Sequence, residues 1–200
     1  MSEIVNTGWD VLDLSHEALR RVVRGVPADA WHLPTPCAKW DVTQVLQHAA
    51  GDQVGFAAFL TGEPGPAEDP FAPSGTLAED PEAYTESALG RSAAAWAGVD
   101  RDAEQVPVPV PPNTMEPSLG AGACALDAAV HAWDIAVATG QPSPLTADMA
   151  RELLEVARRI VEPLRAWGAY AAVLPAAEGD DDVAALLRHL GRDPHWAPAA

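Results

Sequence analysis

Apolar residues recur at helical spacing along most of this chain. Near the N-terminus, Val5, Trp9, Leu12, Leu19 and Val23 follow one another at intervals of three, four or seven residues, which predicts an amphipathic helix over about residues 4–23. Comparable stretches predict five more helices, at about residues 42–60, 81–98, 119–139, 146–167 and 181–190. The chain shows no internal repeat and no convincing strand.

The ends of these helices carry recognisable signals. Gly25 and Pro27 end the first helix, Asp41 or Thr43 caps the second, and Pro81 begins the third. The tail after the last helix is expected to be ordered only if its tryptophan packs back onto the fold.

Two long segments interrupt the helical pattern. Residues 63–81 are rich in Pro, Gly, Asp and Glu without periodicity, which indicates a long loop or lid. Residues 106–117 (VPVPVPPNTMEP) hold too many prolines for a helix interior and predict an extended crossover. The fold class is therefore all-α: an up-down-down-up four-helix bundle with long crossovers and additional C-terminal helices, forming a single domain over residues 1–200.

Composition narrows the possible partners. With 200 residues and 48% hydrophobic content, the chain can bury one core. A formal net charge of −17 would be repelled by nucleic-acid phosphates and by anionic membranes, and is most simply a device for solubility. The remaining expectation is a small-molecule substrate, with the protein a monomer or homodimer.

The same composition predicts a cytoplasmic protein. The two cysteines, Cys37 and Cys124, are too few for a disulfide framework and indicate a reducing compartment. The N-terminus lacks the basic start and following apolar run of a signal peptide, so we expect none. We also expect no membrane span, because no apolar run approaches the roughly 18 residues that one needs.

Candidate chemistry lies in two of the predicted helices. His48 and His131 each lie in an apolar helical stretch, and Asp127 precedes His131 by four residues, which places both on one helix face. A carboxylate and two imidazoles from facing helices would form a three-ligand metal site with an open position, as in catalytic zinc sites. The alternative is that each histidine is a hydrogen-bonded core residue and that the pair of Asp127 and His131 is a plain helix contact.

Two further residues, Asp134 and Cys37, have open roles. Asp134, three residues after His131, is either a rival ligand or, as we favour, a group that orients an imidazole. Cys37 precedes a helix, where a thiol can be reactive, although a small buried residue is the simpler interpretation. The two proline-rich and glycine-rich connections are expected to border the opening above the metal.

Motifs for phosphate loops, serine hydrolases, CxxC sites and HExxH proteases are absent from the sequence.

Three segments resemble a known family. They are TPCAKWDVTQVLQHAAG (residues 35–51), HAWDIAVATG (131–140) and ALLRHLGRDPHW (185–196). Together they are similar to the DinB-like superfamily, in its actinobacterial metal-binding branch related to the N-terminal domain of mycothiol-dependent maleylpyruvate isomerase.

This resemblance implies a four-helix bundle that holds a divalent metal, zinc or nickel, with His48, Asp127 and His131 at the ligand positions. It also implies a low-molecular-weight thiol cofactor, mycothiol or bacillithiol, which the metal would bind and activate as a thiolate. The expected activity is that of an S-transferase or isomerase on a small electrophile. The alternatives are a thiol-independent tailoring enzyme of secondary metabolism and a non-catalytic metal or ligand-binding protein.

Two departures from the isomerase limit this carry-over. The acidic ligand there is glutamate, whereas Asp127 is shorter by one methylene. The isomerase also has a separate C-terminal domain that contributes to its active site, for which this chain leaves no room. We therefore expect the fold and metal site to transfer, but not the isomerase reaction itself.

Overall fold

The computed structural model describes residues 5–198 and confirms an all-α fold. Within these residues the structure has six α-helices: α1 (Asp10–Arg24), α2 (Val42–Thr61), α3 (Pro81–Ala97), α4 (Pro117–Ala138), α5 (Ala147–Ala166) and α6 (Asp182–His189). The predicted helices are therefore all present, and the predicted long connections lie between α2 and α3 and between α3 and α4.

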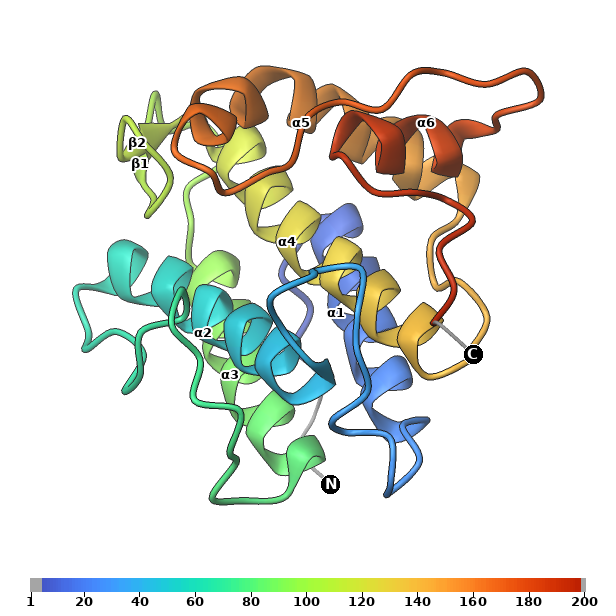
Figure 1. The fold of residues 1–200 in the computed structure, drawn as a ribbon. Coiled ribbons are helices and arrows are strands. Elements are labelled where there is room, and N and C mark those ends of the chain that lie inside the picture. Colours follow the sequence, from blue (N-terminus) through green and yellow to red (C-terminus); the bar gives the residue numbers. More distant parts are fainter. Residues whose placement is uncertain (1–4, 199–200) are drawn as a thin grey trace.

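The first four helices form the bundle. α4 packs against both α1 and α2, and α3 packs against the same two helices. In Figure 1, α1 and α4 run in one direction and α2 and α3 in the other, as expected for an up-down-down-up bundle. α5 packs on α4, and α6 packs on α5, so the C-terminal helices cover α4. This arrangement places the middle of α4 at the centre of the molecule.

The start of α1 differs from the sequence-based boundary. The helix begins at Asp10 because Gly8 has a positive φ of 77° and Trp9 is extended. The Thr7 backbone N–H donates to the Asp13 carboxylate over 3.0 Å. This hydrogen bond gives the Thr7 N–H a partner before the helix begins. Residue 4, at the predicted start, lies outside the described residues.

The start of α2 follows the sequence signal closely. Asp41 is the N-cap: its carboxylate accepts from the Gln44 backbone N–H, and the Gln44 side chain accepts from the Asp41 N–H. This reciprocal pair is a capping box, and it fixes where the helix carrying His48 begins.

The prediction of no strand is wrong at one place. β1 (Val106–Pro107) pairs antiparallel with β2 (Thr114–Met115). Val106 and Val108 are buried and contact Gly120 at the start of α4. Alternate burial of the valines fits a strand, but the intervening prolines lack N–H donors and hide the pattern.

α4 is the most apolar helix of the fold. By length and composition it would suffice to cross a membrane, but 89% of its apolar window is buried inside the bundle. Its apolar residues therefore pack as the core of a folded helical domain, which is consistent with a soluble protein.

Candidate metal centre

Three side chains from α2 and α4 converge in the bundle. Asp127 Oδ1 lies 3.5 Å from His48 Nε2 and 3.4 Å from His131 Nε2. One potential ligand atom of each residue lies within 4.8 Å of the other two. The two imidazole rings are 4.7 Å apart and nearly perpendicular. The structure thus brings together the residues that the sequence nominated as ligands.

The packing of α2 on α4 explains this convergence. Asp127 and His131 lie one turn apart on the face of α4 that meets α2. Small residues surround them on the helix: Ala125, Ala128, Ala129 and Ala132 are all buried. Such short side chains let the two helices approach until His48 reaches Asp127.

A hydrogen bond orients each imidazole from behind. His48 Nδ1 lies 2.9 Å from the carbonyl oxygen of Pro70, and His131 Nδ1 lies 2.9 Å from Asp134 Oδ2. Because a carbonyl and a carboxylate only accept, each Nδ1 carries the donated proton, and Nε2 is the nitrogen that has a lone pair when the imidazole is neutral. Both Nε2 atoms face Asp127, and a metal held there would bind the neutral form of each ring.

Asp134 is itself held by a charged partner. The Arg192 guanidinium donates from Nε to Oδ1 over 2.8 Å and from Nη2 to Oδ2 over 2.7 Å. Asp134 is fully buried, and although burial alone would raise its pKa, Arg192 and His131 hold that pKa well below its usual range. Asp134 therefore supports His131 as an ionised acceptor.

The thiol of Cys37 lies beside the same carboxylate. Its Sγ donates to Asp134 Oδ2 over 3.2 Å. Burial, together with the Asp134 carboxylate, raises the pKa of this thiol far above its usual range. This direction disfavours a reactive thiolate and favours the interpretation of Cys37 as a small buried residue.

Sequence reasoning missed one carboxylate beside the cluster. Asp52 Oδ2 lies 3.8 Å from His48 Nε2, one helical turn along α2. Burial and the charge of Asp127 raise the pKa of Asp52 to about 7. The i, i+4 spacing from His48 was visible in the sequence and is the signal that could have found this residue.

The charges of the cluster act unequally on its histidines. Burial lowers the pKa of His48, but the carboxylates of Asp127 and Asp52 outweigh it and raise the pKa to about 9. For His131, burial prevails and lowers the pKa. Two carboxylates, Asp127 from α4 and Asp52 from α2, thus favour a positive charge on His48.

These residues fit a divalent cation. Asp127 Oδ2 is buried and has no hydrogen-bond partner among the described residues, and an unpaired buried carboxylate oxygen is costly. Two imidazole nitrogens and one carboxylate form a donor set typical of catalytic zinc sites. A second cluster (Cys37, His131 and Asp134) is also compact, but both Asp134 oxygens are already bound to Arg192.

Aromatic rings and a loop carbonyl surround His48. Its ring centroid lies 4.7 Å from the Trp40 ring and 5.5 Å from the ring of Phe71, which is largely exposed. Pro70 and Phe71 belong to the long connection of residues 63–81, which therefore lies against His48. The segment after α5 also approaches: burial and the nearby Asp127 carboxylate raise the pKa of Tyr170.

The second connection packs over the start of α4. Val106 and Val108 pack on Gly120 and Trp96. Among the described residues, no hydrogen bond or ion pair joins residues 106–119 to His48, Asp127 or His131. Its valines instead cover the first turn of α4.

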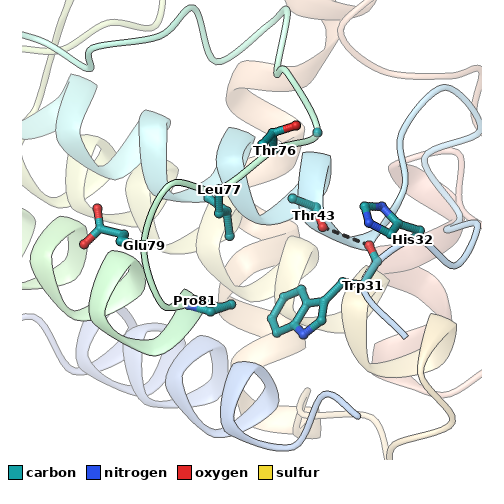
Figure 2. Close-up of a pocket in the computed structure, with 8 residues that line it drawn as sticks. Trp31, His32, Thr43, Thr76, Leu77, Glu79 and Pro81 are labelled. Carbon is teal, nitrogen blue, oxygen red and sulfur yellow. Dashed lines mark hydrogen bonds between the residues drawn. The ribbon is translucent and has the colours of Figure 1, made fainter. Parts of the chain in front are cut away.

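A separate cleft of about 370 Å³ lies beside the connector that precedes α2. Figure 2 shows Trp31, Leu77 and Pro81 around it, with the Thr43 hydroxyl donating to the Trp31 carbonyl. None of the three candidate ligands lines this cleft. It contains no cluster of ligating or nucleophilic side chains and adds nothing to the metal centre.

Comparisons with known proteins identify the family of this chain. Residues 12–136 match the family described as the mycothiol maleylpyruvate isomerase N-terminal domain, a stretch that contains all three candidate ligands. Two proteins of Mycobacterium tuberculosis, from strains CDC 1551 and H37Rv, are each 30% identical over 151 residues. The similarity covers 74% of this chain and 76% of each relative, and both are described only as uncharacterized proteins. No solved structure matches.

Proposed function

The chain belongs to the family of the mycothiol maleylpyruvate isomerase N-terminal domain, and from this premise we propose that it is a metal-dependent enzyme that joins a small thiol to an electrophile. His48, Asp127 and His131 would hold one divalent cation, with zinc preferred and nickel as the alternative. The observation that carries this proposal is the convergence of the three side chains around the unpartnered Asp127 Oδ2.

The cation would supply positive charge that favours ionisation of a thiol at neutral pH. The protein's own part is to keep the ligand atoms in place: Pro70 and Asp134 fix the two imidazole rings. Mycothiol is the proposed cofactor because the family is named for it, and the reaction is an S-transfer or an isomerisation through a thiol adduct.

The surroundings of the centre favour a small, uncharged substrate. Trp40 and Phe71 pack on His48 and leave apolar surface beside it. The neighbouring Asp52 side chain, with a pKa raised to about 7, is placed to hydrogen-bond a neutral group. Arg192 is bound to Asp134 and is not free to bind an anion. We propose a cytoplasmic small-molecule enzyme without a nucleic-acid or membrane partner.

Metal analysis followed by a thiol assay tests this function. Purified protein should contain about one zinc or nickel per chain and should consume mycothiol with a panel of small electrophiles. His131→Ala protein, measured beside it, should lose both metal and turnover. Metal-dependent turnover that needs no thiol would favour the tailoring enzyme instead. Stoichiometric metal without turnover on any electrophile would favour a binding protein.

A further inference from the structure

The residue that secures Asp134 comes from the far end of the chain. Arg192 follows α6 and lies 58 positions beyond Asp134 in the sequence, outside the residues matched by the family. Its side chain is largely buried against Asp134, which is fully buried. A fully buried carboxylate requires such a partner.

The local structure aims Arg192 at this target. Gly191 ends α6 with a positive φ of 78°, and the Arg192 backbone N–H donates to the carbonyl of Leu187 over 2.8 Å. A Cβ at Gly191 would lie 2.8 Å from Ala171, so the turn needs glycine for conformation and for space. Beyond it, Trp196 packs against the bundle core. We call residues 182–196 the C-terminal arm, and Figure 1 shows it returning to the end of α4.

We propose that Arg192 is a positioning residue for the metal centre: through Asp134 it holds His131 with Nε2 directed at Asp127. The inference rests on the proposed metal centre. Its geometry is a continuous chain in which Arg192 donates to both Asp134 oxygens, and Asp134 Oδ2 accepts from His131 Nδ1 over 2.9 Å.

The same chain of contacts couples the arm to the metal. An arm docked through Arg192 favours the His131 orientation that binds metal, and bound metal in turn favours the docked arm. Such coupling is reciprocal by thermodynamic necessity. Zinc should therefore protect the backbone amides of the C-terminal arm from hydrogen exchange, although the arm contributes no ligand.

The first test measures zinc dissociation constants by chelator competition. Arg192→Gln should bind zinc about 10–100-fold more weakly than wild type, the range for loss of a group that orients a metal ligand. Arg192→Lys keeps the charge without the two-pronged contact and should fall in between. Arg188→Gln is the matched control, because Arg188 in the same arm pairs with Asp180 rather than Asp134, and it should bind zinc as wild type does.

Each outcome decides the matter. If wild type binds no metal, the proposed function fails and this inference falls with it. If wild type binds zinc but Arg192→Gln binds within threefold of it, or if Arg188→Gln is weakened equally, the positioning role is overturned while the metal centre stands. Weakening confined to the Arg192 variants supports the role.

A second variant covers the case in which Arg192→Gln fails to fold. The double variant Asp134→Asn with Arg192→Gln buries no unpaired charge and keeps an oxygen that accepts from His131. It should fold and still bind zinc more weakly than wild type. Wild-type affinity in this variant, or absence of zinc-dependent exchange protection in the wild-type arm, would overturn the proposal.

Discussion

His131 is the residue on which metal binding should depend most steeply, because its Nε2 faces Asp127 while Asp134 acts only from behind. His131→Ala should lose the metal and keep its helicity, since packing of the bundle supplies most of the folding energy. Asp134→Ala should keep part of its metal. Metal content and circular dichroism would show this, with exposed His32→Ala as the control. Equal metal loss in both variants would make Asp134 either a ligand or an essential support for His131.

His16 should make stability depend on pH. Burial lowers its folded-state pKa to about 4, despite the hydrogen bond to Gln53. The unfolded chain, with a pKa of about 6.5, therefore binds this proton first, so the free energy of unfolding falls as pH drops from about 6.5 to 4, by up to about 1.4 kcal/mol per unit. Urea titrations of wild type and His16→Gln should show a shallower slope in the variant. Identical slopes would contradict this role.

For single residues, the sequence predicted contacts within one helix but not contacts between distant segments. Asp127 and His131 could be proposed as ligands because i, i+4 spacing on a helix fixes which side chains share a face, and His48 because it is a histidine in an apolar helical stretch. Arg192 could not, since nothing in the sequence indicates which carboxylate a tail arginine will reach. The Pro70 carbonyl that orients His48 was equally invisible, because any residue carries a carbonyl.

Two glycines of α2 allow the contribution of Pro70 to zinc binding to be tested apart from changes in helix propensity. A Cβ at Gly51 would lie 2.9 Å from Pro70 Cβ, whereas one at Gly55 would meet nothing within 4 Å. Gly55→Ala should raise stability by up to about 1 kcal/mol through helix propensity alone. Gly51→Ala should displace Pro70 from His48 and weaken zinc binding several-fold. The two zinc affinities, measured together, decide: equal affinities would mean that Pro70 does not matter.

Element boundaries were predicted correctly where the sequence carries a capping signal, and incorrectly where the prediction rested on composition or apolar spacing. Asp41 begins α2 as the capping pattern required. By contrast, the prolines of residues 106–117 concealed a short antiparallel pair, and apolar residues before Gly8 suggested an earlier start for α1 than the structure has. Periodicity records which residues prefer burial, but not where the backbone turns.

For the molecule as a whole, metal should act as a stabilising ligand. Binding to the folded state alone adds about 2.7 kcal/mol when free zinc is 100 times its dissociation constant. For a chain of this size that corresponds to a rise of roughly 5–10 °C in the melting temperature. Thermal melts with and without zinc should show this shift in wild type. A similar rise in His131→Ala would assign it to nonspecific binding.

The packing of the bundle could be inferred from the sequence because its helices are long and amphipathic or apolar throughout. α4 is the most apolar helix, and it lies at the centre, packed against α1, α2 and α5. How α5 and α6 fold over it was not predictable in detail, since it depends on the turn at Gly191 and on Trp196 finding the core. That return of the chain is what joins the end of the molecule to its metal centre.

The most direct test of the metal centre is an anomalous difference map from crystals grown with zinc, recorded on both sides of the zinc absorption edge. One peak should appear within about 2.0–2.2 Å of His48 Nε2, His131 Nε2 and an Asp127 carboxylate oxygen. A map without a peak at this position, or with its peak among other residues, would contradict the account.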